Sequence, residues 1–146
     1  MSSTNNHWKL IKTVLPQHTD HAGVMWHGSY LAFLEEGRID ALNKVGLSYS
    51  KLSKKGFEIP VISVQLRYKK SFIHGEEVLL TSQFKLENEI RLTCKTLLLK
   101  SNGDIGAEAS IGLVVARRID DSIKLVRDLP VQIKNILLML EEGPKK

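Results

Sequence analysis

The sequence predicts an α+β fold in which a curved antiparallel β-sheet wraps around one long central α-helix. Three observations carry this prediction. Residues 28–45 repeat apolar side chains at three- and four-residue steps, which is the period of an amphipathic helix. Most of residues 59–118 instead alternate between polar and apolar side chains, as strands do. The Asn102-Gly103 pair between two alternating runs is a strong signal for a β-hairpin.

The first expected strand covers residues 8–15, which alternate and include β-branched side chains, and Pro16 ends it. The polar residues 1–6 before it predict a disordered tail. For the long helix, Ser29 is the expected N-cap and Gly46 the glycine stop. The apolar stripe that would face the sheet consists of Tyr30, Phe33, Leu34, Gly37, Ala41, Leu42 and Val45.

The rest of the chain consists mainly of expected strands, after a connector over residues 47–57 with a short helical turn. These strands are predicted at residues 59–68, 77–86, 89–99 and 105–118. Turns at Glu87-Asn88 and Asn102-Gly103 join the last three into an antiparallel meander, and their length favours a strongly curved sheet. Residues 130–142 predict a C-terminal helix with Pro130 near its first turn.

Length and composition are those of one globular domain spanning residues 1–146, without room for a separate cofactor domain, so we expect no cofactor. With 42% hydrophobic and 25% charged residues, a disordered or fibrous chain is excluded. Cys94 is the one cysteine, which excludes an intramolecular disulfide and fits a reducing compartment. The N-terminus lacks the apolar core of a signal peptide, and no apolar run approaches the ~20 residues of a membrane span. We therefore expect a soluble, cytoplasmic protein.

Two surface properties bear on partners. The outer sheet face would carry Leu97, Leu99, Val114 and Ala116, so we expect self-association through the sheet or its edge. The net charge of +5 is scattered in small clusters, and the chain lacks zinc-finger and RNA-binding-sheet motifs. We therefore expect no nucleic-acid partner, whereas a small anionic ligand stays open.

The loop over residues 17–30 carries the candidate chemistry. It leads into the N-terminus of the long helix, where unpaired backbone N–H groups and the helix dipole favour an anion or a developing oxyanion. Asp20 lies just ahead of these donors, so its carboxylate could attack a carbonyl or deprotonate a water. These residue types suggest acyl transfer. The structural alternative is that Asp20 only closes an Asx turn, and that Gly23 and Gly28 only supply positive φ angles.

Other nucleophiles and metal chemistry fit poorly. His18, His21 and His27 are spaced unlike the common zinc sites, so we expect no metal. The chain has no Gly-x-Ser-x-Gly motif, and Cys94 lies inside an alternating run, where a small packed residue is expected. Ser–His–Asp and Cys–His mechanisms are therefore disfavoured.

The loop and the start of the helix match a known pattern. Residues Thr19-Asp20-x-x-Gly23-Val24-Met25-x-His27-x-x-Tyr30-x-x-Phe33-x-Glu35-x-x-Arg38 resemble the signature of the 4-hydroxybenzoyl-CoA thioesterase family of hotdog-fold acyl-CoA thioesterases. The resemblance covers roughly residues 8–118 and includes Ile73-His74-Gly75-Glu76-Glu77, which is similar to that family's turn before a long strand. It implies the hotdog fold and a homodimer with one continuous sheet and sites at the interface, or a homotetramer made of two such dimers.

Carried onto this chain, the resemblance assigns the catalytic carboxylate to Asp20, as nucleophile or general base, and the oxyanion-binding N–H to His27. The substrate-binding positions that it implies are Gly23, Trp26, Gly28, Tyr30 and Glu35, the last on the helix that faces the partner subunit. Glu35 could instead be a favourable charge in the first half of the helix, and Arg38 a structural ion-pair partner. Many relatives have another acid at the position of His18 and Ala or Pro at that of His21, which leaves the pH dependence open.

The substrate that the resemblance implies is an acyl-CoA, hydrolysed to the free acid and coenzyme A. Lys69, Lys70, Arg117 and Arg118 lie near predicted strand ends, where they could meet the CoA phosphates or only protect the sheet edges. Trp26, Tyr30, Phe57 and Phe72 would suit an aromatic or a medium-length aliphatic acyl group. An acyl-carrier-protein thioesterase and a non-catalytic module that binds acyl thioesters are the alternatives. A dehydratase is disfavoured, because the sequence offers no separate His-plus-acid pair for that chemistry.

Overall fold

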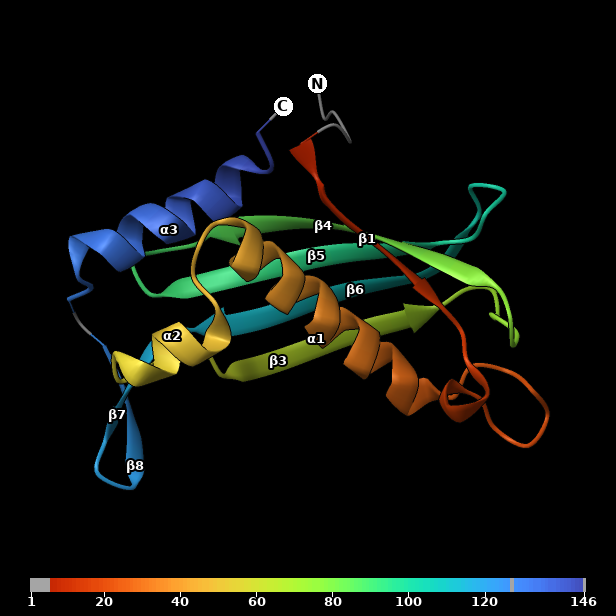
Figure 1. The fold of residues 1–146 in the computed structure, drawn as a ribbon, viewed down its shortest axis with the longest axis horizontal. Helices are drawn as coiled ribbons and strands as arrows, with labels where there is room; N and C mark the ends of the chain where they lie inside the picture. The colour runs from red at the N-terminus through yellow and green to blue at the C-terminus, as the bar shows by residue number, and fades with distance from the viewer. Residues whose placement is uncertain (1–5, 127, 146) are drawn as a thin grey trace.

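A five-stranded antiparallel β-sheet forms the body of the computed structural model, which describes residues 6–126 and 128–145. Its strands are β1 (Trp8–Thr13), β3 (Val61–Tyr68), β4 (Glu77–Leu86), β5 (Arg91–Leu99) and β6 (Ile105–Val114). They follow the order β1-β4-β5-β6-β3, so β1 and β3 are the two edges. The helix α1 (His27–Lys44) crosses one face of this sheet (Figure 1). The arrangement confirms the predicted fold class.

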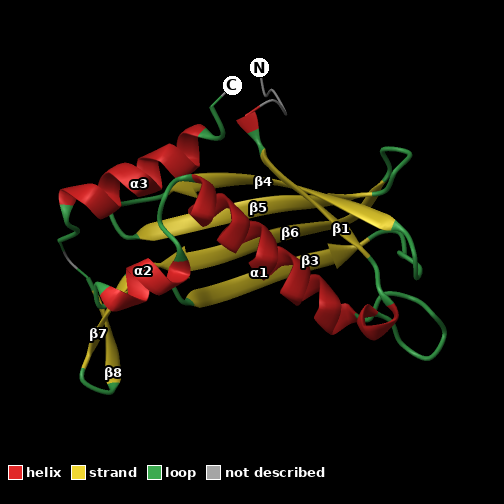
Figure 2. Ribbon diagram, in the orientation of Figure 1, coloured by secondary structure: helices red, strands yellow, loops and turns green. Residues whose placement is uncertain are grey.

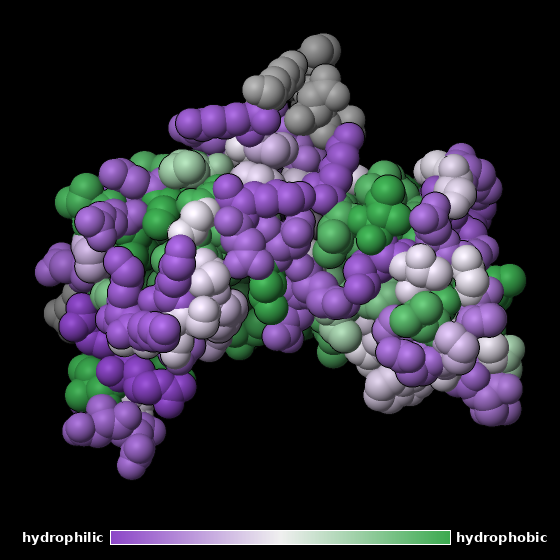
Figure 3. All heavy atoms as spheres, viewed as in Figure 1, coloured by the Kyte–Doolittle hydropathy of each residue, from purple (hydrophilic) through white to green (hydrophobic). Residues whose placement is uncertain are grey.

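The helix α1 packs on the sheet through the predicted apolar stripe. Its buried residues are Ser29, Tyr30, Phe33, Leu34, Gly37, Ala41 and Leu42. From the sheet, β4 contributes Val78, Leu80 and Phe84, which are at most 3% exposed. The helix approaches so closely that a Cβ on Gly37 would lie 3.7 Å from Leu80 Cδ2. Figure 3, drawn from the side of α1, shows mainly hydrophilic residues over the middle of the molecule, so only one face of the helix enters the core.

The start of α1 differs from the prediction, while its end agrees. The N-cap is Trp26 and not Ser29. Ser29 lies inside the first turn, where its hydroxyl donates a hydrogen bond to the His18 carbonyl at 2.9 Å. Because this bond joins the helix to the preceding loop, Ser29 anchors the loop instead of capping the helix. At the other end, Gly46 adopts φ +86°, which confirms the glycine stop.

Two predicted strands are interrupted where the chain changes sheets. The predicted strand 59–68 begins only at Val61, because Pro60 has no N–H to donate, and the short β2 (Phe57–Glu58) precedes it. The predicted strand 105–118 divides at Val115, whose N–H donates to the Ile90 carbonyl at 2.8 Å. The second part, β7 (Ala116–Ile119), pairs with β2 and with β8 (Ser122–Leu125), which the sequence did not indicate. These strands form a second sheet, from which the β7–β8 hairpin projects (Figure 1).

The remaining helices lie around the ends of the sheet (Figure 2). They are the 3₁₀ helix η2 (Pro16–His18), α2 (Tyr49–Lys54) in the predicted connector, and the predicted C-terminal helix α3 (Val131–Glu142). Helix α3 is tied to the first strand, because the Trp8 indole Nε1 donates to the Leu140 carbonyl at 2.9 Å. Within the part of the chain that the structure describes, no helix is long and apolar enough to cross a membrane. The predicted tail over residues 1–6 lies outside the described residues, apart from Asn6.

Exposed apolar side chains follow the β3 edge more than the outer sheet face. Leu97 and Leu99 are partly exposed on that face, but Val114 and Ala116 are buried within the chain at 3% and 1% exposure. The expected contribution of Val114 and Ala116 to an apolar outer surface is therefore wrong, because the chain itself covers them. On β3 the exposed apolar residues are Val61, Ile62, Val64 and Tyr68, between 43% and 54% exposed. Of the two edges of the sheet, the β3 edge thus exposes more apolar side chains.

Candidate active site

Asp20 opens a tight turn between η2 and α1. Its N–H donates to the Val24 carbonyl at 2.9 Å, and the Gly23 N–H donates to the Asp20 carbonyl at 3.0 Å. Gly23 adopts φ +78°, which favours glycine and lets the turn close. The Asp20 Oδ1 accepts the N–H groups of Ala22 at 2.8 Å and Val24 at 3.2 Å. The Asx turn considered as the structural alternative is thus formed, and it orients the carboxylate.

This turn occupies only one oxygen of the carboxylate. The Asp20 Oδ2 makes no hydrogen bond with any residue that the structure describes, and the side chain is exposed. A carboxylate that is held by one oxygen and available at the other can attack a carbonyl carbon or take a proton from a water molecule. Asp20 can therefore close the Asx turn through one oxygen and act as a nucleophile or base through the other.

The helix α1 begins with unpaired backbone donors. Its N-cap, Trp26, makes no side-chain capping hydrogen bond. The Trp26 N–H donates to the His18 carbonyl at 2.8 Å, whereas the N–H groups of His27 and Gly28 find no acceptor among residues 6–126 and 128–145. Two adjacent N–H groups at the positive end of an 18-residue helix can stabilise a carbonyl oxygen as it gains negative charge.

The carboxylate and the helix start line one cavity of about 380 Å³. Its lining consists of Asp20, Val24, Met25, Trp26, His27, Tyr30, Tyr68, Lys69, Lys70 and Ser71. One wall comes from the loop before α1 and from its first turns, and the other from the end of β3 and the loop after it. The walls are joined by the Met25 N–H, which donates to the Phe72 carbonyl at 2.8 Å. Of the predicted site residues, the structure brings together Asp20, Trp26, His27, Tyr30, Lys69 and Lys70.

Three aromatic rings shape this cavity. The Trp26 side chain is half exposed, whereas Tyr30 is 3% exposed and meets the ring of Tyr68 edge to face, with centroids 4.9 Å apart. Burial, and then the neighbouring Tyr68, raises the pKa of the Tyr30 hydroxyl, so it stays protonated at neutral pH. The Trp26 indole lies across Gly28, where a Cβ would overlap the ring. Gly28 therefore leaves room for the Trp26 ring and does not serve a positive φ angle.

The four predicted phosphate-binding cations divide into two pairs. Lys69 and Lys70 line the cavity, where Lys69 Nζ lies 3.4 Å from Glu108 Oε1 and Lys70 Nζ 2.7 Å from Asp104 Oδ2. Arg117 and Arg118 lie on β7 instead. The Arg117 guanidinium lies 4.7 Å from the Phe57 ring centroid, and Arg118 pairs with Glu58 at 3.1 Å. The structure therefore separates the two arginines from the cavity.

Several other expected lining residues lie elsewhere. Glu35 is exposed on α1 outside the cavity, and Arg38 forms no ion pair within the described ranges. Phe57 is buried in the second sheet and Phe72 is fully buried behind Tyr30, with ring centroids 6.3 Å apart. The expectation that these two phenylalanines contact the acyl group is therefore corrected: Phe72 supports the wall from behind.

His18 and Cys94 have local structural roles. His18 Nδ1 accepts the Leu15 N–H at 3.0 Å, and its ring meets Phe33 edge to face at 4.9 Å. No group of three or more His, Cys, Asp and Glu side chains among the described residues could hold a metal ion. Cys94 is fully buried, and burial raises the pKa of its thiol to about 11. This thiol is therefore packed and protonated, as its place in an alternating strand predicts.

Sequence reasoning missed two residues of the second wall, Tyr68 at the end of β3 and Ser71 in the loop after it, although it named Lys69 and Lys70 between them. Tyr68 and Ser71 line the cavity although they are far from Asp20 in the chain. The antiparallel bridge between Val24 and Ile73 brings the two segments together. The only signal in the sequence was Tyr68 itself, an aromatic residue at the end of an alternating run.

Comparison with known protein families assigns the chain to one of them. The model of the thioesterase-like superfamily matches residues 14–130. The chain belongs to the thioesterase-like superfamily. As a member of this superfamily, it has the hotdog fold and is a thioester hydrolase, which confirms the predictions of fold and reaction class.

Individual members of the superfamily and solved structures agree with this assignment. The Synechocystis protein named "Putative esterase sll0410" is 30% identical over 140 residues, which are 95% of this chain and 83% of that protein. The structure of a DHNA-CoA thioesterase from Staphylococcus aureus is 26% identical, with a TM-score of 0.76 over 83% of this chain and 80% of that one. The Staphylococcus aureus protein SAV2348, solved in complex with CoA, is 13% identical, with a TM-score of 0.82 over 96% and 87% of the two chains. This last likeness shows the fold alone.

Proposed function

We propose that this thioesterase hydrolyses acyl-CoA to the free acid and coenzyme A in the cavity between the Asp20 turn and the start of α1. One observation carries the proposal. Asp20, with its available carboxylate oxygen, and His27, with its unpaired N–H, line the same cavity, and the unpaired N–H of Gly28 comes next in the chain, so a nucleophile or base and an oxyanion site are combined.

The reaction follows from these two groups. Asp20 either attacks the thioester carbon directly or takes a proton from a water molecule that attacks it. In both routes a C–O bond forms, and the carbonyl electron pair moves to the oxygen that the N–H groups of His27 and Gly28 stabilise. When this intermediate collapses, the C–S bond breaks and the CoA thiolate leaves. If Asp20 attacks, a water molecule then hydrolyses the acyl anhydride and regenerates the carboxylate.

Substrate recognition divides between aromatic and basic residues of the cavity. Trp26, Tyr30 and Tyr68 offer flat surfaces for an aromatic or medium-length aliphatic acyl group. Lys69 and Lys70 follow Tyr68 on the wall opposite Trp26 and Tyr30, where their ammonium groups could exchange carboxylate partners for CoA phosphates. The solved thioesterase for DHNA-CoA and the CoA complex of SAV2348 are consistent with such a ligand.

A second copy of the chain completes the site in this proposal. The exposed apolar edge of β3 can pair antiparallel with the same edge of another copy about a twofold axis. Such pairing brings the start of the partner's β3 beside the end of this one, next to Tyr68 and the cavity. Glu35 then lies on the helix that faces the partner, and two dimers could associate further into a tetramer.

The proposal is tested with Asp20→Asn. The Asn carbonyl oxygen can still accept the N–H groups of Ala22 and Val24, so the turn and the melting temperature should be retained. Because the amide can neither attack nor take a proton, thioester hydrolysis should fall by about 10²–10⁴-fold. The measurement is release of free thiol from acetyl-, octanoyl- and benzoyl-CoA and from an acyl carrier protein carrying the same acyl groups.

The matched control is Asp121→Asn, which makes the same change in the exposed turn between β7 and β8 and should leave the rate unchanged. Full activity of Asp20→Asn would overturn the mechanism. Saturable binding of acyl-CoA by the wild-type chain without thiol release would instead identify a binding module, and faster hydrolysis of acyl carrier protein would change the substrate.

A further inference from the structure

The Asp20 turn does not stand alone, because the loop after β3 pairs with it. The Met25 N–H donates to the Phe72 carbonyl at 2.8 Å, and the His74 N–H donates to the Gly23 carbonyl at 3.1 Å. Between these bonds lies the antiparallel bridge of Val24 and Ile73. The turn that orients the proposed catalytic carboxylate is thus one side of a two-segment ribbon, and residues 69–76 are the other.

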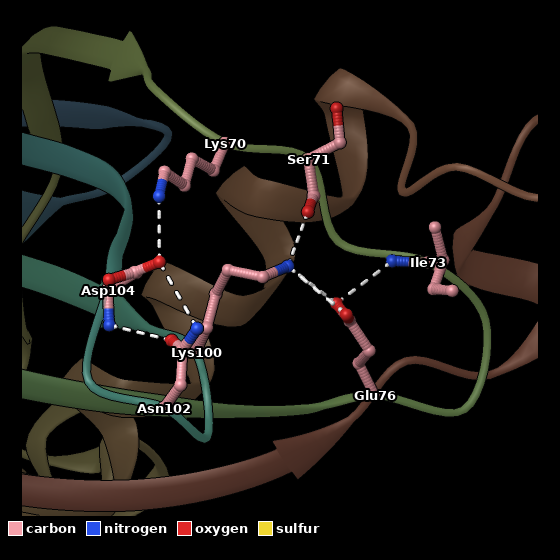
Figure 4. Close-up of polar contacts among 7 residues, drawn as sticks. All are labelled: Lys70, Ser71, Ile73, Glu76, Lys100, Asn102 and Asp104. Carbon is pink, nitrogen blue, oxygen red and sulfur yellow. Dashed lines mark hydrogen bonds and ion pairs between the residues drawn. The ribbon is translucent and has the colours of Figure 1, made fainter.

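Lys100 contacts this second segment (Figure 4). It is not one of the residues that line the cavity. Its Nζ donates to the Ser71 carbonyl at 2.6 Å and to both carboxylate oxygens of Glu76, at 3.2 and 2.8 Å. The same Nζ lies 4.5 Å from the ring centroid of Phe72. One ammonium group thus contacts three residues of the loop, Ser71, Phe72 and Glu76.

The backbone of Lys100 is itself fixed. It follows β5 directly, where its N–H donates to the Asp104 carbonyl at 2.8 Å and its carbonyl accepts the Gly103 N–H at 2.9 Å. This is the turn at the predicted Asn102-Gly103 hairpin. Lys100 therefore connects a rigid hairpin of the sheet to the loop of the active site.

Glu76 connects the Lys100 ammonium group to the ribbon. Its Oε2 accepts the Ile73 N–H at 3.1 Å, so the carboxylate links Lys100 to the residue that bridges to Val24. The Lys100 hydrogen bond is the main cause that lowers the pKa of Glu76. The Lys100 and Glu76 side chains are 17% and 33% exposed, against 57% and 43% for Lys70 of the same loop and its partner Asp104 in the turn between β5 and β6. The less exposed pair is screened less by water and holds more strongly.

We propose that Lys100 is a positioning residue of this thioesterase: through Glu76 and the Ser71 carbonyl it fixes residues 71–76, and through that segment the direction of the Asp20 carboxylate. Lys100 does not line the cavity and touches no reacting atom. The inference rests on the proposed function for its catalytic consequence, while its structural part concerns the ribbon alone.

The test removes the ammonium group with Lys100→Met, which retains much of the stem. In the variant, amide hydrogen exchange at Met25 and His74 should accelerate, because their acceptors lie on the two sides of the ribbon, while exchange at Thr96 in the middle of β5 stays unchanged. The kcat for the acyl-CoA that the wild type hydrolyses fastest should fall by about 10- to 100-fold, the size expected for a small misplacement of a catalytic group. Lys100→Arg, which keeps donors and charge, should recover part of this loss.

The matched control is Lys134→Met on α3, which removes the exposed ion-pair partner of Glu89. It should change neither the amide exchange nor the kcat. Glu76→Gln provides a second variant, and combining it with Lys100→Met should cost less than the sum of the two single losses. Unchanged exchange at Met25 and His74 in Lys100→Met would overturn the proposal, as would a kcat equal to that of the control. If the wild type hydrolyses no thioester, the proposed function fails, and the exchange measurement still decides whether Lys100 holds the ribbon.

Discussion

Gly28 shows at the scale of one residue how the site depends on space as well as on chemistry. Like its neighbour His27, Gly28 is expected to contribute a backbone N–H, and it also contributes the absence of a side chain. The Trp26 indole occupies the position that a Cβ would take. This ring is half exposed and lines the cavity, so a change at Gly28 is a change in the shape of the site.

We therefore expect Gly28→Ala to separate substrate binding from stability. Alanine is favoured over glycine in a helix by about 1 kcal/mol, so the free energy of unfolding should stay equal or rise. The displaced indole should raise the KM for aromatic acyl-CoA several-fold, measured by thiol release. As a contrast, Gly46→Ala should lower the stability without changing the KM, because φ +86° is strained for alanine. An unchanged KM in Gly28→Ala would show that Trp26 does not contact the acyl group.

At the scale of elements, strands β4 and β6 differ in how far the sequence predicts them. β4 covers residues 77–86 as expected, because one regular alternation begins and ends with the strand. For β6 the alternation continues past the point where the chain changes neighbours, and Val115 looks like any other strand residue in the sequence. The division into β6 and β7 depends on which chain segment accepts the Val115 N–H. That acceptor is set by tertiary structure and not by the local sequence.

The same distinction applies to the candidate site. Asp20, His27 and Tyr30 are close in the sequence, so their spacing against a helix start could be recognised. Tyr68 and Ser71 enter through pairing between distant segments, which no local pattern encodes. The residue type of Ser29 predicts an N-cap, but its hydroxyl donates to the His18 carbonyl instead.

Strand β6 supports the site from behind, which leads to a prediction for its glycines. A Cβ on Gly106 would overlap the Phe72 ring and lie 3.2 Å from the Lys70 carbonyl, whereas a Cβ on Gly112 would overlap the Ser63 hydroxyl. Gly106→Ala should lower the free energy of unfolding by about 1–3 kcal/mol through overpacking, whereas Gly112→Ala should cost less, because the exposed Ser63 hydroxyl can rotate away. Only Gly106→Ala should also lower kcat, because Phe72 carries a carbonyl of the ribbon. Equal effects of both variants on kcat, compared at equal folded fraction, would contradict this.

For the whole molecule, the two free edges of the sheet are unequal. The β3 edge exposes several apolar side chains and ends at the cavity, whereas the β1 edge exposes chiefly Ile11, at 60%. Val64→Lys should therefore convert the proposed dimer into a monomer of 16.5 kDa, measured by light scattering, and lower activity with it. Ile11→Lys adds the same charge to the other edge and should leave the mass unchanged. Dissociation by Ile11→Lys alone would place the interface at β1.

The hydrogen bond between the Trp8 indole and the Leu140 carbonyl spans 132 positions of the chain. It joins β1 to α3, so both elements must be present before this contact can form. On the ribosome, β1 is made long before α3, so its final environment arrives only when α3 has emerged. Strand β1 is therefore made early but completes its contacts late, after α3 has been translated.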